Sequence, residues 1–192
     1  MEPLRILIAE DESLTRAILR TRLEKLGHQI VAEAENGLQA LEAVRATKPD
    51  AILMDIRMPV MDGIEAARQI ITEHPCALLF LTAYNDEDLV QQASETGALA
   101  YLMKPFRKEE LAPALEIAMR RFRQLQDQNQ KIACLKEALE TRKIIERAKG
   151  ILMDQHGMTE QDAFRYIHFK ARSQNKKMRE IAEGILAEPD KV

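Results

Sequence analysis

The sequence predicts an α/β protein with a parallel β-sheet covered by helices on both faces, followed by a long helix and a small helical domain. In the first 106 residues, apolar runs alternate with amphipathic stretches, as in repeated βα units. Residues 1–106 carry 10 Lys and Arg against 17 Asp and Glu, whereas residues 142–179 carry 10 against 4. This asymmetry suggests two modules with different partners, although solvated helix faces would produce it too.

The strand and helix pattern accounts for five βα units. Continuous apolar runs at 6–8, 51–54 and 77–81 suit strands buried on both faces, and weaker candidates lie at 29–34 and 100–103. Amphipathic stretches near 13–26, 38–46, 63–73 and 86–96 predict the helices between them. In such a sheet, ligands bind near the carboxyl ends of the strands.

Those strand ends carry three acids, a hydroxyl and a lysine. The first run ends at Glu10 and Asp11, the third at Asp55, the fourth at Thr82 and the fifth at Lys104. Carboxylates brought together require a cation, and ligands that are all oxygen favour Mg²⁺ over Zn²⁺. Alternatively, the acids at 10–12 simply begin a helix, where they favour the dipole; that explains residue 12 but not the other strand ends.

Composition excludes several classes of protein. The 46% hydrophobic content fits a globular core rather than disorder. No apolar run is long enough to span a bilayer, and the first residues lack the layout of a signal peptide, so we expect a soluble, cytoplasmic protein without membrane partners. Cys76 and Cys134 form neither a disulfide framework nor a metal-binding pattern.

Four motifs in order, "ILIAEDE", "ILMDIRMPVMDGIEA", "FLTAY" and "GALAYLMKPF", resemble the receiver domain of two-component response regulators. The resemblance covers residues 1–121 as a receiver domain. It implies a flavodoxin-like (βα)5 fold with strand order two-one-three-four-five. It also implies that a sensor histidine kinase phosphorylates Asp55.

The same resemblance assigns a metal site. It implies that Asp11 and Asp55 bind Mg²⁺ directly, that Glu10 acts through water, and that the backbone carbonyl of Arg57 is a further ligand. Glu10 stands where the family more commonly has aspartate. The chemistry is consistent, because a carboxylate can attack a phosphoryl group when cations offset the accumulating charge.

Three further residues receive roles by resemblance. Lys104 would pair with Asp55 and then with a phosphate oxygen, and Thr82 would offer its hydroxyl to another oxygen. Tyr101 resembles the aromatic residue that turns inward when Thr82 moves, although a half-buried strand tyrosine would look the same. The family has a cis bond before Pro105.

From residue 107 the pattern changes to one long helix with heptad-like spacing. It predicts a coiled-coil seam that continues through a linker helix at 122–137 and supports a parallel homodimer. Asn129 occupies a core position, and beyond residue 132 the seam continues best through Leu135 and Leu139 after a shift of three residues. A single helix packed on its own domain is the alternative. The seam positions are Leu111, Leu115, Ala118, Phe122, Leu125 and Ile132.

Residues 138–192 predict three helices: the end of the long one to about 156, a second from near 160, and a third at 179–186. Gly157 is a helix stop, and Thr159 with Asp162 forms a capping box. The predicted core contains Ile144, Ile151, Leu152, Phe164, Ile167, Met178, Ile181 and Ile185.

The motifs "IERAKGILM", "AFRYI" and "ARSQNKKMREIA" within 138–192 resemble the ANTAR domain, an RNA-binding antitermination module. The pattern departs at His168, where arginine is more usual. The resemblance implies binding to RNA hairpins in nascent leader transcripts, so that RNA polymerase continues past a terminator.

A cluster of basic and polar residues suits phosphates and unstacked loop bases. Gln174 and Asn175 are polar neighbours, and Tyr166 either stacks on a base or, more simply, packs against the third helix. The candidate RNA contacts are Lys149, Arg165, Arg172, Ser173, Lys176, Lys177 and Arg179.

Two other outputs remain open from sequence: a DNA-binding domain and a protein-interaction domain. The final helices lack a clear recognition helix with a short preceding turn, which disfavours DNA binding. An enzyme is least expected, because the last 50 residues contain no nucleophile, base and orienting group, and His156 and His168 lack a metal-ligand spacing. We therefore expect a phosphoacceptor regulator.

Overall fold

The computed structural model describes residues 2–83 and 98–188. The chain divides into two compact units, Met1–Gln126 and Asp127–Val192. The helix predicted at 86–96 lies outside the described residues. No helix in the described part of the chain combines the length and apolarity needed to cross a bilayer.

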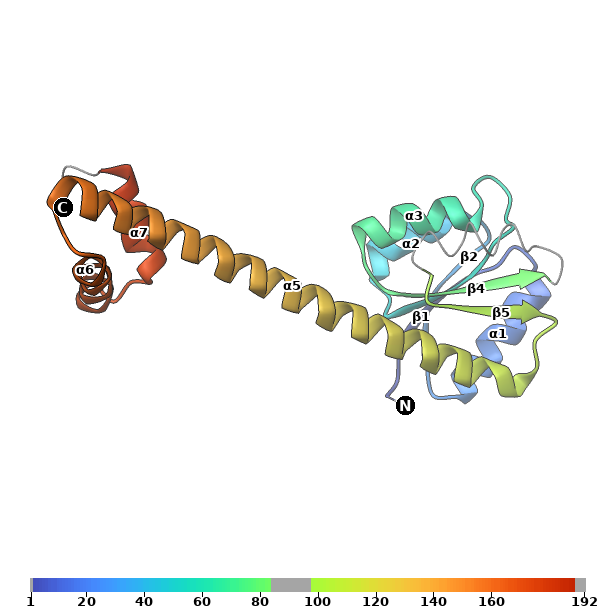
Figure 1. The fold of residues 1–192 in the computed structure, drawn as a ribbon. Helices are drawn as coiled ribbons and strands as arrows, with labels where there is room; N and C mark the ends of the chain where they lie inside the picture. Colours follow the sequence, from blue (N-terminus) through green and yellow to red (C-terminus); the bar gives the residue numbers. More distant parts are fainter. Residues whose placement is uncertain (1, 84–97, 189–192) are drawn as a thin grey trace. The chain divides into compact units, whose positions relative to one another are not determined.

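The first unit contains a five-stranded parallel sheet (Figure 1). Its strand order is β2-β1-β3-β4-β5, which confirms the predicted flavodoxin-like topology. All five predicted strands are present, within one or two residues of the expected limits. They are β1 (Arg5–Ala9), β2 (Gln29–Ala34), β3 (Ala51–Asp55), β4 (Ala77–Ala83) and β5 (Ala100–Lys104).

Helices cover both faces of this sheet (Figure 1). On β3, Leu53 packs with one helix pair, whereas Ile52 and Met54 pack with the other, and all three side chains are fully buried. Burial on both faces explains why the strand sequences are continuously apolar rather than alternating. The first pair is α1 (Ser13–Lys25) with the start of α5 (Lys108–His156), and the second is α2 (Gly37–Thr47) with α3 (Gly63–Glu73).

The start of α5 corrects one prediction. Leu111, Leu115 and Ala118 are fully buried in the core of the first unit, and Phe122 packs against that core. The proposal that an intermolecular seam begins at Leu111 is therefore wrong, because these side chains already have partners within their own domain. The positions that remain open are Leu125, Ile132, Leu135 and Leu139, which are 45%, 49%, 69% and 54% exposed.

The second unit contains the rest of α5, α6 (Glu160–Ser173) and α7 (Met178–Ala187). Gly157, at φ 65°, follows the last residue of α5, and the Thr159 hydroxyl oxygen accepts a hydrogen bond from the Asp162 N–H at 3.2 Å, as predicted. The buried core comprises Ala148, Leu152, Ala163, Ile167, Ala171, Ile181, Ala182 and Ile185.

Phe164 does not belong to this core. Its side chain is 47% exposed, because the buried face of α6 runs through Ala163, Ile167 and Ala171, at steps of four residues. Phe164 is about 100° of helix rotation from Ala163 and about 60° from Ile167, so it lies at the edge of that face. Of the other predicted core residues, Ile144, Ile151 and Met178 are partly buried.

Candidate functional site

The carboxyl ends of β3, β4 and β5 bring the predicted site residues together. Asp55 is the last residue of β3, and Lys104 is the last residue of β5. Thr82 lies one residue before the end of β4, the strand between them, and is paired with Met103 of β5. Because neighbouring parallel strands end at the same edge, residues far apart in sequence converge there.

Glu10, Asp11 and Asp55 form an acidic cluster at this edge. One carboxylate oxygen from each lies within 4.8 Å of the others. Glu10 is fully buried and Asp55 is 9% exposed, whereas Asp11 is exposed. Glu12 is not a member of the cluster; its carboxylate instead accepts a hydrogen bond from the Thr15 hydroxyl at 2.6 Å.

Lys104 partly neutralises the cluster. Its Nζ lies 2.5 Å from Oδ2 of Asp55 and 2.6 Å from Oε2 of Glu10. Burial opposes the charge on Lys104, but its contacts with Asp55 and Glu10 outweigh burial and raise the pKa of the amine. Burial raises the pKa of Glu10 to about 6, and the nearby Asp55 charge adds to this effect while Lys104 opposes it. One cation therefore does not fully offset the acids.

The donor atoms fit a hard divalent cation. Lys104 pairs with Oε2 of Glu10 and with Oδ2 of Asp55, so this one ammonium group is shared between two of the three carboxylates. A divalent cation would offset the remaining negative charge. The three candidate ligands are all carboxylates, which suits Mg²⁺.

The segment after β3 is held tightly against Asp55. The Arg57 N–H donates a hydrogen bond to Oδ1 of Asp55 at 3.2 Å, and the Gly63 N–H donates to the Ile56 carbonyl at 2.8 Å. A Cβ placed on Gly63 would lie 2.0 Å from the carbonyl oxygen of Asp55. Only glycine therefore permits this approach of α3 to the strand end.

Thr82 and Tyr101, the two residues of the expected switch, lie on the neighbouring strands β4 and β5. Thr82 is 2% exposed. Tyr101 is half-buried on β5, and its ring stacks on Phe80 with 6.2 Å between centroids and 22° between planes. Tyr101 is paired across the strands with Phe80, two residues before Thr82.

In the second unit, Lys149 occupies a different environment from the other predicted RNA contacts. It is only 6% exposed, and its Nζ lies 2.9 Å from Glu146 and 2.7 Å from Glu160. These hydrogen bonds, to Glu160 first, raise the pKa of the amine. The geometry makes Lys149 a link between α5 and the start of α6 rather than an open cation.

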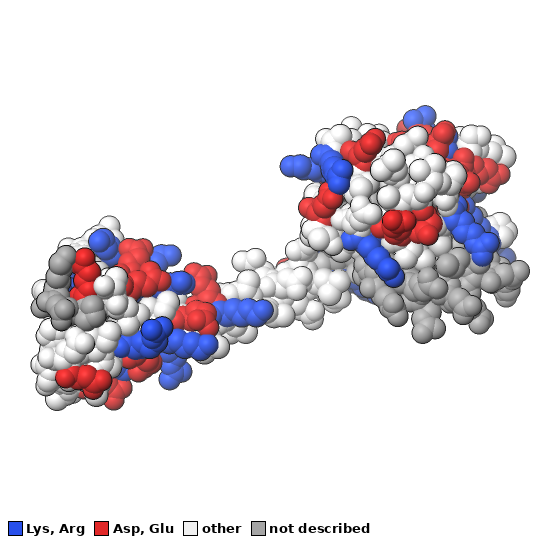
Figure 2. Space-filling model, turned by 90° about the horizontal axis from the view of Figure 1, so that it is seen from above, with Lys and Arg blue, Asp and Glu red and all other residues white. Residues whose placement is uncertain are grey.

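The remaining predicted contacts lie at the surface. Arg179 is half-buried and pairs with Glu183 at 2.7 Å. Figure 2 shows lysine and arginine atoms gathered on part of this unit, with acidic atoms beside them. The exposed members are Arg165, Arg172, Ser173, Lys176 and Lys177. Within residues 2–83 and 98–188, none of the four basic side chains in this set has a carboxylate partner.

Sequence reasoning missed two exposed aromatic residues on α6. Phe164 is 47% exposed and stacks on His168, with 6.3 Å between ring centroids and 16° between planes. Phe169 is 72% exposed. Four-residue steps from Ala163 locate the buried face of α6 and place Phe169 outside it. Phe164 lies three residues before Ile167 and seven before Ala171, so spacing alone does not exclude it from the core.

Two protein families match this chain. The response regulator receiver domain family matches residues 6–116, and the ANTAR domain family matches residues 133–186. The transcriptional regulatory protein PdtaR of Mycobacterium tuberculosis is 46% identical over 184 residues, covering 96% of this chain and 90% of that protein. The chemotaxis protein CheY of Listeria monocytogenes is 36% identical over 116 residues, covering 60% of this chain and 98% of CheY.

Solved structures agree for the first unit. The receiver domain of the response regulator NarL from M. tuberculosis superposes with a TM-score of 0.58 at 34% identity, covering 62% of this chain and 98% of that one. A receiver domain of a diguanylate cyclase from Desulfovibrio desulfuricans gives 0.60 at 29% identity, covering 64% and 98%.

Fold, site and matches together define a response regulator. The chain belongs to the family in which a receiver domain is joined to a C-terminal ANTAR domain. This combination supports a role in transcription regulation through RNA-binding antitermination.

Proposed function

We propose that phosphorylation of Asp55 controls the binding of the ANTAR unit to hairpins in nascent leader transcripts, and that this binding causes antitermination. The RNA-binding part of this proposal rests on the surface of α6. There, the exposed rings of Phe164 and Phe169 lie on the same helix as Arg165 and Arg172, whose guanidinium groups have no described partner. Exposed rings suit base stacking, and free cations suit phosphates.

The geometry at the end of β3 supports Asp55 as the phosphoacceptor. A carboxylate oxygen of Asp55 attacks the phosphorus of a donor, a P–O bond forms, and the leaving group of the donor departs with its bonding electrons. We propose a sensor histidine kinase as the donor. Lys104, already 2.5 Å from Asp55, then pairs with a phosphate oxygen, and the Thr82 hydroxyl donates to another.

Mg²⁺ is the proposed metal, held directly by Asp11, Asp55 and the backbone carbonyl of Arg57, with Glu10 acting through water. When bound, it offsets the negative charge that phosphoryl transfer brings into this acidic site. The chain itself contributes the fixed position of the acceptor, because Gly63 and the Arg57 N–H hold the end of β3 in place.

Signal output would begin with Thr82. As its hydroxyl moves toward the phosphoryl group, it leaves space beside β5, and the half-buried ring of Tyr101 moves inward. The surface around β5 and the start of α5 then changes shape. This is a packing change with a local electrostatic cause.

A homodimer is the proposed assembly, at least after phosphorylation. An exposed apolar series lies on α5 and consists of Leu125, Ile132, Leu135 and Leu139. The residues of α5 that are buried in the receiver core do not belong to this series. Exposed apolar side chains in helical spacing favour association with a second copy. A strict monomer in analytical ultracentrifugation, both before and after phosphorylation, would refute this assembly.

The protein as proposed is a regulator and not an enzyme in its own right, apart from turnover of its own phosphoryl group. It would work in the cytoplasm, where transcripts are made.

Titration of the full-length protein with hairpin RNA and with duplex DNA at fixed salt tests the output. We expect selective hairpin binding that weakens as salt rises, because phosphate contacts release counterions. Lys177→Gln should weaken binding and reduce the salt slope by about 0.7 to 0.9. Lys143→Gln is the matched control and should change little, because Lys143 pairs with Glu140 at 2.8 Å.

Equal, weak binding to both nucleic acids would contradict an RNA-specific output. Preferential binding to duplex DNA would support the alternative of a DNA-binding regulator instead. If neither nucleic acid binds in any phosphorylation state, the protein-interaction alternative gains support.

A further inference from the structure

We propose that the pocket between α6 and α7 receives a single unstacked base of the bound RNA, and that Gln174 recognises the polar edge of this base. The inference rests on the RNA-binding function proposed above. It adds a defined receptor for one nucleotide, separate from the exposed aromatic face of α6.

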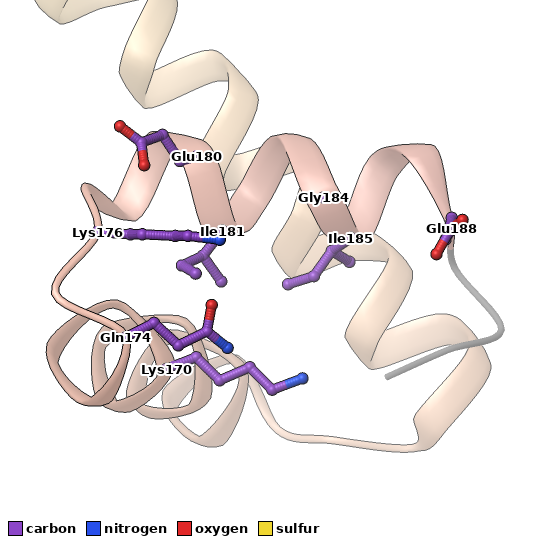
Figure 3. A pocket seen from close by; sticks show the side chains of 8 residues that line it. All are labelled: Lys170, Gln174, Lys176, Glu180, Ile181, Gly184, Ile185 and Glu188. Atoms are coloured by element: carbon purple, nitrogen blue, oxygen red, sulfur yellow. The ribbon is translucent and has the colours of Figure 1, made fainter.

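The pocket has a volume of about 180 Å³ and an apolar floor (Figure 3). Ile181 and Ile185 of α7 form this floor, and they are only 7% and 4% exposed because they also belong to the core of the unit. The floor is therefore preformed by packing. A flat base placed over the two isoleucines would contact their exposed carbons without a rearrangement of the core.

Polar groups lie around this floor. In Figure 3, the side chain of Lys176 and the amide of Gln174 both extend over the cavity from the turn between α6 and α7, and Lys170 runs along its α6 edge. The side chains of Gln174 and Lys176 have no hydrogen-bond or ion-pair partner among the described residues. An amide offers both a donor and acceptors, which matches the edge of a nucleobase.

The backbone fixes the position of these groups. Asn175 adopts φ 52°, and the Lys176 N–H donates a hydrogen bond to the Ala171 carbonyl at 2.9 Å, so the turn after α6 is closed. The ammonium of Lys170 lies 4.6 Å from the centre of the Tyr166 ring. Such a cation–π contact restrains the lysine while leaving its other donors available.

Charges of both signs line the pocket, two lysines and two glutamates. Lys170 and Lys176 would contact the phosphates on either side of the base. Glu180 and Glu188 also line the pocket, but in Figure 3 the Glu180 carboxylate points away from the cavity and Glu188 lies at its far end. Acidic groups on the α7 side would confine the RNA backbone to the α6 side, and only the base would enter.

Gly184 provides the test. It lines the pocket within α7, and a Cβ placed on it meets no atom within 4 Å. Gly184→Met should fill the pocket while leaving the fold intact, because methionine is the better helix former. The matched control is Ala187→Met, an exposed position of the same helix that does not line the pocket.

The probe is one hairpin selected by the full-length wild-type protein from a pool with a constant stem and a randomised loop. Each loop nucleotide is then replaced in turn by an abasic one. We expect Gly184→Met to weaken binding about tenfold or more, which is the size of one lost base-stacking contact. In the wild-type protein, one abasic position should weaken binding by the same factor as Gly184→Met does. In Gly184→Met, that abasic position should cause no further loss of affinity. Gln174→Ala should relax base preference at that position alone.

The pocket assignment would be overturned if Gly184→Met bound the hairpin with wild-type affinity. It would also be overturned if every abasic substitution weakened the binding of Gly184→Met further. A loss of the same size on fully duplex RNA would assign the pocket to phosphates and also overturn it. If the wild-type protein selects no hairpin, the RNA-binding function itself fails, which is a different outcome.

Discussion

Replacement of Asp55 by asparagine should abolish incorporation of labelled phosphate from a small-molecule phosphoryl donor such as acetyl phosphate. The neutral amide keeps the size of the side chain but removes the nucleophilic charge that lies 2.5 Å from Lys104. The measurement is the amount of label bound to the purified full-length protein and its release by mild base, as expected of an acyl phosphate. Label that persists in Asp55→Asn would place the acceptor elsewhere.

Two controls make this result specific. Glu12→Gln should retain labelling, because Glu12 lies outside the carboxylate cluster although it adjoins it in sequence. Chelation of Mg²⁺ should suppress labelling of the wild-type protein.

Labelling should also depend on pH. Since burial raises the pKa of Glu10 to about 6, acidification through pH 6 neutralises this carboxyl. The concentration of Mg²⁺ needed for labelling should therefore rise as the pH falls through that value.

Gly63→Ala should destabilise the receiver by about 3 kcal/mol or more. The added Cβ would lie 2.0 Å from the Asp55 carbonyl oxygen, a backbone atom that cannot rotate away. Either α3 or the end of β3 must move, and the Gly63 N–H bond to Ile56 is lost with it. Denaturant unfolding followed by circular dichroism measures the change.

Gly150→Ala is the matched control. It lies inside α5, where a Cβ meets nothing within 4 Å, so alanine should stabilise the helix by about 0.5–1 kcal/mol. We expect the free energy of unfolding to fall in Gly63→Ala and to rise in Gly150→Ala. A Gly63→Ala protein as stable as the wild type would show that the strand end is not held as described.

The residues of the receiver site could be predicted from the sequence because the topology of the sheet brings them together. Continuous apolar runs define buried parallel strands, and parallel strands end at one edge, so Asp55, Thr82 and Lys104 had to converge. The glycine contact at Gly63 was not predictable in the same way. It depends on how closely α3 approaches the strand end, which no local pattern encodes.

The long helix shows where periodicity fails. A helix packed on its own sheet and a helix in a coiled coil both place apolar residues at steps of three and four. Leu111 and Leu115 follow that spacing but lie in the receiver core, whereas Leu135 and Leu139 follow it and stay exposed. Only the tertiary structure distinguishes the two groups.

The ANTAR unit was predictable in its helices and less so in its surface. Lys149 belongs to a basic cluster in sequence, yet two carboxylates bind it in the folded unit. Phe164 belongs to an apolar cluster in sequence, yet it faces solvent. The pocket beside Gln174 is formed by two helices and the turn between them, so it has no sequence signature of its own.

Hairpin affinity measured before and after phosphorylation tests the central claim most directly. The wild-type protein should bind its selected hairpin more tightly after treatment with the phosphoryl donor, and Asp55→Asn should show the same affinity with and without the donor. Equal affinity of the wild-type protein in both states, with labelling of Asp55 verified in the same sample, would contradict the coupling between the acidic site and RNA binding.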